Sequence, residues 1–92
     1  MLLLPTAVTL AEARDTLRML AQAVPSEAGG EITLDASGLK RFDTSALAVL
    51  LECKRLAQAE GKRFAVVRAP RKLADLARLY GLEALLLPAA AD

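Results

Sequence analysis

Two acidic residues flank one short loop and are the first candidates for chemistry. Asp35 ends the alternating run Glu31–Asp35, and Asp43 follows the loop directly. Two carboxyl groups held close together can serve as a general acid and a general base. The structural alternative is that Asp35 ends a strand and Asp43 caps a helix. We favour the structural alternative and keep a small enzyme as a minor hypothesis.

A hydroxyl group in the same segment suggests a different kind of chemistry. Asp43, Thr44 and Ser45 are three consecutive candidates for the cap of the next helix. A helix N-terminus favours negative charge, so a phosphate on Thr44 would be tolerated there. It would also add about two charges beside Asp43 and could repel a partner that docks at this end. The alternative is that Thr44 only caps the helix.

Other reactive groups are scarce. The chain has no histidine, which excludes Ser-His-Asp and Cys-His catalysis and every histidine metal site. Cys53 is the single cysteine, so it forms no internal disulfide, and its aliphatic neighbours indicate an inert core position. Gly61-Lys62 lacks the earlier glycine of a phosphate-binding loop, because position 56 is leucine. We therefore expect no catalytic residue, metal or cofactor.

Length and composition predict one domain over residues 1–92. The chain has 54% apolar and 25% charged residues and a net charge of +1, unlike a disordered tail or a basic nucleic-acid binder. The apolar run Ala46–Leu51 is far shorter than the roughly 20 residues that span a bilayer. Met1–Pro5 does not resemble a signal peptide. We expect a cytoplasmic module that binds no nucleic acid and does not insert into a membrane.

Strands and helices alternate along the chain and would position these residues. Thr9 and Glu12 form a capping box for the first helix, whose expected apolar stripe is Leu10, Ala13, Leu17, Leu20, Ala21 and Val24. The expected order is a strand at Leu2–Leu4, a helix at Leu10–Val24, a strand at Glu31–Asp35, a helix at Ser45–Ala59, a strand at Phe64–Arg68, a helix after Pro70 and a short last strand at Leu85–Leu87. A loose tail would follow at residues 89–92. This order predicts an α/β layer fold with helices on a mainly parallel sheet.

Two features of the sequence are not explained by the packing of helices on a single sheet. The apolar residues of the helix at Ser45–Ala59 cover more than the ~100° arc that packs on one sheet, so the helix is either enclosed within the domain or offers part of its surface to a partner. The segment Lys54–Arg78 carries a net charge of +6, against −5 elsewhere. That segment is either a solvated surface or a basic face for an acidic partner or anionic lipid headgroups.

The segment around Thr44 resembles the signature of the STAS domain family, which includes sulfate transporters and anti-sigma-factor antagonists. The likeness is carried by the strand Ile32–Asp35, the run Phe42-Asp43-Thr44-Ser45-Ala46-Leu47, and the stretches Gly61–Val67 and Leu76–Leu82. It covers about Leu2 to Leu87 and implies a small STAS-like α/β fold. Position 46 is alanine where the family usually has glycine.

Within the family, the chain is most similar to the small stand-alone subunit of the Mla phospholipid transport system. This resemblance implies a non-catalytic accessory subunit that binds the ATPase of an inner-membrane ABC transporter, with Thr44 at the contact. The alternative is an anti-sigma-factor antagonist, switched by phosphorylation of Thr44 and bound by an anti-sigma-factor kinase. The flanking contacts would be Asp43, Ser45, Ala48 and Leu51.

The N-terminal strand suggests a further contact. Members of the family carry an extra strand before the one that ends near Leu4, and this sequence lacks or truncates it. The uncovered edge at Leu2–Leu4 could pair with a second copy and form a homodimer.

Overall fold

The main sheet contains three parallel strands. The computed structural model describes residues 1–87, and the loose tail predicted at residues 89–92 lies outside them. The strands β1 (Leu2–Leu3), β3 (Glu31–Asp35) and β5 (Arg63–Val67) lie side by side in the order β1–β3–β5. The central strand β3 buries Ile32 and Leu34 completely, as expected for a strand with neighbours on both sides. The predicted mainly parallel α/β sheet is confirmed.

A second, very small parallel sheet brings two connecting segments together. Its strands are β2 (Ala7–Val8) and β4 (Arg41–Phe42), with Val8 beside Phe42. The sequence predicted a loop at β4, because two-residue strands carry no readable periodicity. Since β2 immediately precedes the first helix and β4 precedes the second, this pairing places the starts of the two helices next to each other.

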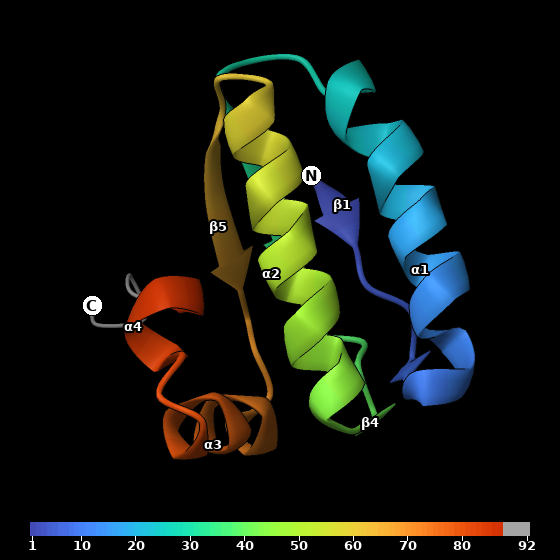
Figure 1. Cartoon of the computed structure of the whole chain (residues 1–92), viewed down its shortest axis with the longest axis vertical. Coiled ribbons are helices and arrows are strands. Elements are labelled where there is room, and N and C mark those ends of the chain that lie inside the picture. The colour runs from blue at the N-terminus through green and yellow to red at the C-terminus, as the bar shows by residue number, and fades with distance from the viewer. Residues whose placement is uncertain (88–92) are drawn as a thin grey trace.

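Four α-helices and one 3₁₀ turn complete the described chain. They are α1 (Leu10–Ala23), the 3₁₀ turn η1 (Val24–Ser26), α2 (Thr44–Ala59), α3 (Arg71–Leu79) and α4 (Glu83–Leu86). Figure 1 shows α1 and α2 side by side on one face of the sheet, with α3 below the carboxyl end of β5 and α4 to the left of that strand. The predicted capping box starts α1, since Glu12 Oε1 accepts a hydrogen bond from Thr9 N at 2.8 Å. Gly61, with a φ of 71°, follows α2 in the left-handed conformation expected there.

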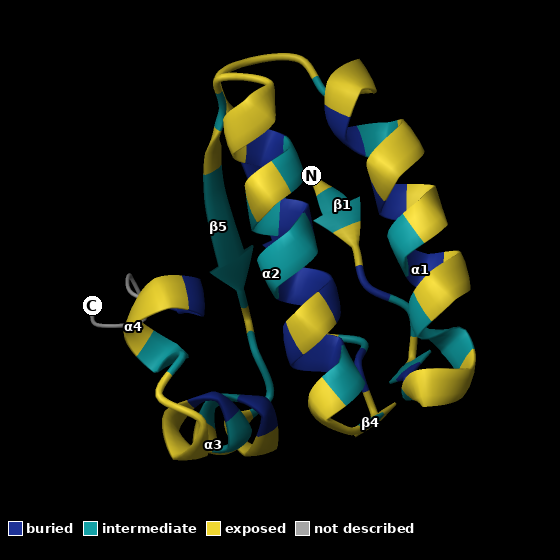
Figure 2. Ribbon diagram, in the orientation of Figure 1, coloured by how far each residue is buried: buried dark blue, intermediate teal, exposed yellow. Residues whose placement is uncertain are grey.

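Helix α2 packs against several elements of the domain and keeps one exposed face. It contacts α1, β5 and α4, and Figure 2 shows buried residues along most of its length. Its buried side chains are Ala46, Leu47, Val49, Leu50, Cys53 and Ala57. This packing on several sides accounts for much of the wide apolar arc of the helix. Ala48 stays exposed, so a surface offered to a partner remains a prediction.

Three sequence-based expectations were wrong. The last strand at Leu85–Leu87 is absent, and residues Glu83–Leu86 form α4 instead. A three-residue apolar run fits a helix end as well as a strand, so only packing decides between them. In α1, Leu10 and Ala21 are exposed, while Thr16 takes a buried place on the inner side of the helix.

Both edges of the main sheet are open within residues 1–87: β1 pairs only with β3, and β5 pairs only with β3. The homodimer through β1 stays a prediction. In the same residues, no helix is both long and apolar enough to cross a bilayer.

Candidate docking site at the start of α2

Thr44 is the first residue of α2, and its side chain is exposed. The cap of the helix is Asp43, whose Oδ1 accepts a hydrogen bond from Ser45 N at 2.8 Å. The cap is therefore Asp43 and not Thr44, and a role of Thr44 in partner binding remains a prediction. Its hydroxyl lies at the surface, where the exposed amides of a helix start favour negative charge.

Asp43 accepts hydrogen bonds from the first turns of two helices. Besides its bond to Ser45, its Oδ2 accepts a hydrogen bond from Leu10 N, the first residue of α1, at 3.2 Å. The Ser45 backbone bond, followed by the Leu10 bond, outweighs partial burial and lowers the pKa of Asp43. The carboxylate is therefore charged at neutral pH, and a phosphate on Thr44 would stand directly beside it.

A shallow apolar groove runs between α1 and α2 next to Thr44. It has a volume of about 410 Å³. Its lining residues are Leu10, Ala13, Arg14, Leu17, Ser45, Ala48 and Val49. Two of the predicted contact residues, Ser45 and Ala48, therefore face one surface feature. Leu51 is partly buried and packs against the core, so it offers less accessible surface than the sequence suggested.

Leu10 is the functional candidate that the sequence analysis missed. The helical pattern assigned it to the core, but its side chain is 78% exposed at the lip of the groove. Leu10 is the first residue of α1, and its side chain is not part of the buried core. The available signal was its place directly after the Thr9 cap, at the very end of the helical pattern.

Asp35, the other acidic candidate, pairs with a basic residue of the fold. Asp35, only 6% exposed, pairs with Arg68, whose Nη2 donates to Asp35 Oδ2 at 2.5 Å. Ser37 N also donates to Asp35 at 2.8 Å. The Arg68 bond, supported by Ser37, holds the pKa of Asp35 well below its usual range. Since each carboxylate is held by its own local donors and both stay ionised at neutral pH, their arrangement matches the structural alternative.

Cys53 lies in the core, as predicted. Its side chain is fully buried on α2, and burial raises the pKa of the thiol to about 11. A thiol with such a pKa is a poor nucleophile at neutral pH. Residues 1–87 contain no group of three or more potential metal ligands.

Comparison with known proteins decides the family. The family model described as "Mlab, STAS domain" matches residues 1–88, nearly the whole chain. The chain belongs to the STAS domain family and is MlaB-like. STAS domains generally serve as non-catalytic regulatory and interaction modules. No curated protein matches the chain.

The family assignment agrees with the fold of this STAS domain. The strand that ends at Asp35, the helix that starts at Thr44 and the strand at Arg63–Val67 stand in the order that the resemblance implied. The site that the fold presents is an exposed hydroxyl, a charged cap and an apolar groove. Such a surface suits protein contact rather than bond-making chemistry.

Proposed function

We propose that this STAS domain is an accessory subunit that binds the ATPase of an Mla-type phospholipid ABC transporter. Two observations support the proposal: the MlaB-type family match and the exposure of Thr44 beside an apolar groove. The exposure of Thr44 is the observation on which the proposal mainly depends, because a partner can reach this residue without any rearrangement of the fold. In this proposal the domain lies on the cytoplasmic side of the inner membrane, held there by the ATPase.

The groove would supply the binding energy, and Thr44 would supply the control. Burying an exposed leucine such as Leu10 against a partner contributes about 1.5–3 kcal/mol. Ser45 and Ala48 have small side chains, which let a partner side chain enter the groove. A phosphate on Thr44 would bring about two negative charges to the rim of this apolar contact, beside the ionised Asp43. Added charge should therefore release the partner.

The alternative function is that of an anti-sigma-factor antagonist controlled by phosphorylation of Thr44. It requires a hydroxyl that a kinase can reach, and Thr44 meets this requirement. The two functions differ in the partner rather than in the site. In both, the domain acts by docking and catalyses nothing.

Co-purification from native membranes separates these functions. We expect the tagged chain, expressed at its natural level, to retain an ABC ATPase together with its permease. Recovery of a kinase with its sigma factor would support the antagonist instead. If no ATPase is recovered with the tagged chain, either from detergent extracts or from chemically cross-linked membranes, the transporter proposal is overturned. A chain carrying Thr44→Glu, purified in parallel, shows whether the recovered partner depends on this site.

A further inference from the structure

A second groove lies at the carboxyl end of the main sheet and is bordered by positive charge. It has a volume of about 440 Å³. Its cationic residues are Lys40, Arg68, Arg71 and Lys72. Lys40 comes from the loop after β3, Arg68 directly follows β5, and Arg71 and Lys72 begin α3. Parallel strands end at one edge of a sheet, so the fold gathers charges from distant parts of the sequence there.

Most of this charge is not neutralised within the domain. Arg68 pairs with Asp35, but Lys40, Arg71 and Lys72 form no ion pair within residues 1–87. No acidic side chain of the described residues lines the groove. By contrast, Arg55 and Arg78 pair with carboxylates nearby, and Lys62 donates to the carbonyl oxygens of Val24 and Glu27.

The floor of this basic groove is apolar. Leu39 is almost completely buried, and Phe42 and Pro70 are partly exposed. A groove with an apolar floor and a cationic rim suits a peptide segment that carries acidic residues around an apolar side chain. An anionic headgroup alone would use the rim and leave the floor uncovered, so the floor favours a protein segment.

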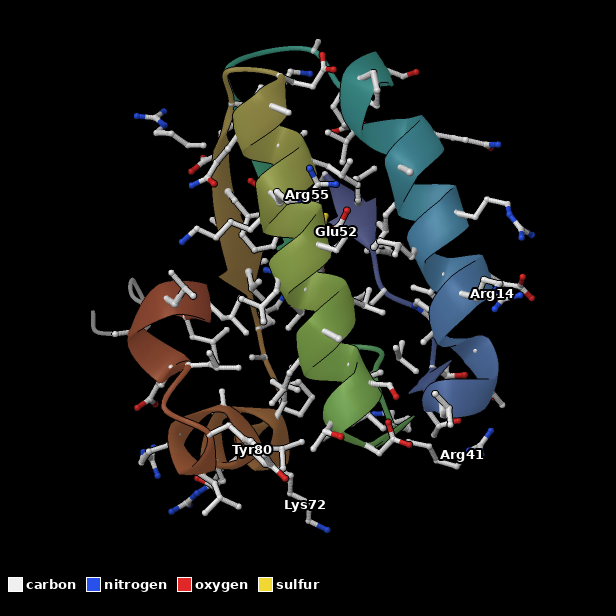
Figure 3. All side chains as sticks on the ribbon, viewed as in Figure 1. Arg14, Arg41, Glu52, Arg55, Lys72 and Tyr80 are labelled. Carbon is white, nitrogen blue, oxygen red and sulfur yellow. The ribbon has the colours of Figure 1, made fainter. Side chains whose placement is uncertain are left out.

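The basic groove adjoins the Thr44 site. Phe42 lines the basic groove, and Ser45, three residues later, lines the groove between α1 and α2. Thr44 therefore lies on the segment that separates the two grooves. In Figure 3, Lys72 on α3 and Arg41 beside the start of α2 lie at the same end of the molecule. A protein that covers Thr44 can reach both grooves with one continuous surface.

We infer that the basic groove binds an acidic segment of the protein that docks at Thr44. The inference rests on the proposed function for the identity of that protein, the transporter ATPase. The apolar groove would then hold the partner in place, while the basic groove would guide its approach and select a partner surface of opposite charge. Phosphorylation of Thr44 would weaken both contacts, because its negative charge also lies close to the cationic rim.

Charge reversal tests the inference in the intact chain. The variants are Arg71→Glu and Lys72→Glu, and the matched control is Arg63→Glu, an exposed arginine at the opposite end of β5. One probe is a fluorescein-labelled decapeptide of glutamates around a central leucine, measured by anisotropy at low salt. A second is the ATPase recovered with the wild-type chain. Circular dichroism and thermal melting show that each variant is folded.

We expect each reversal in the groove to weaken the binding of both probes by about five- to tenfold, and Arg63→Glu to change it by less than about twofold. Binding should also fall as salt rises. Equal binding by Lys72→Glu and Arg63→Glu would overturn the inference. Binding of the wild-type chain to phosphatidylglycerol vesicles but not to the peptide would also overturn it, in favour of a lipid surface. If Thr44→Glu releases the ATPase while Lys72→Glu retains it, the proposed function stands and the inference fails.

Discussion

Asp43 and Leu10 are 33 residues apart in sequence, yet the Asp43 carboxylate accepts a hydrogen bond from the Leu10 backbone amide at 3.2 Å. The same carboxylate caps α2 through Ser45 N. One side chain thus fixes the starts of both helices that border the apolar groove. The proposed docking surface is therefore held in shape by Asp43, and Thr44 stands next to that carboxylate.

Replacing Asp43 should loosen the two helix starts to different extents. Asn offers one carbonyl oxygen in place of two carboxylate oxygens, so Asp43→Asn can keep only one of the two hydrogen bonds. Asp43→Ala loses both. We expect amide hydrogen exchange to accelerate at Leu10 or Ser45 in the Asn variant and at both in the Ala variant, while core amides such as that of Leu34 stay protected. Unchanged exchange in the Ala variant would show that the carboxylate does not hold these helices.

The ion pair between Asp35 and Arg68 should make the fold sensitive to acid. Since folding lowers the pKa of Asp35, its contribution to stability is complete above pH ~4 and is lost as the pH falls further. Asp35→Asn should lower the free energy of unfolding at pH 7. The difference in this free energy between the variant and the wild-type chain should become smaller towards pH ~2–3. Urea titrations at several pH values measure this. The control is Asp15→Asn, which removes a highly exposed carboxylate. A gap independent of pH would contradict the assigned role of Asp35.

Much of the fold follows from local sequence signals. Thr9 with Glu12, Asp43 and Gly61 mark helix boundaries, and the structure places those boundaries within one residue of the predicted ones. The strand at Glu31–Asp35 has the predicted bounds. These features were predictable because caps, left-handed glycines and alternating patterns act over a few residues.

Other features depend on long-range packing and could not be read locally. The pairing of Val8 with Phe42 and the bond between Asp43 and Leu10 join segments more than 30 residues apart. The exposure of Leu10 depends on which neighbours pack against the first turn of α1, which helical periodicity does not encode. The basic groove combines residues after two different strands, although the excess of charge in that part of the chain was visible in the sequence.

Cys53 should resist alkylation in the folded chain. Its thiol is fully buried and its pKa is raised to about 11, so both access and thiolate formation are reduced. We expect maleimide labelling at pH 7 to be at least about a hundredfold slower than in guanidinium chloride, because labelling requires opening of the core. Intact mass spectrometry follows the reaction. Rapid, complete labelling of the native chain would show that α2 is not packed as described.

The apolar groove can be tested with two leucines of equal exposure. Leu10 lies on the groove and is 78% exposed, while Leu79 on α3 lies outside it and is 77% exposed. Leu10→Asp should weaken ATPase binding by about tenfold or more, since it removes an apolar contact of about 1.5–3 kcal/mol. Leu79→Asp should leave it unchanged. Biolayer interferometry measures both affinities. Equal losses of affinity in the two variants would show that the partner does not contact the groove.

In the proposed function, the partner binds the surface around the Thr44 hydroxyl, and added charge at this point releases it. The most direct measurement is the affinity of the recovered ATPase for the wild-type chain and for Thr44→Ser and Thr44→Glu, with thermal melts to confirm that each variant is folded. We predict that Thr44→Ser binds within about threefold of the wild-type chain and that Thr44→Glu binds at least about tenfold more weakly. A folded Thr44→Glu chain that binds the ATPase as tightly as the wild-type chain would show that the partner does not bind at Thr44.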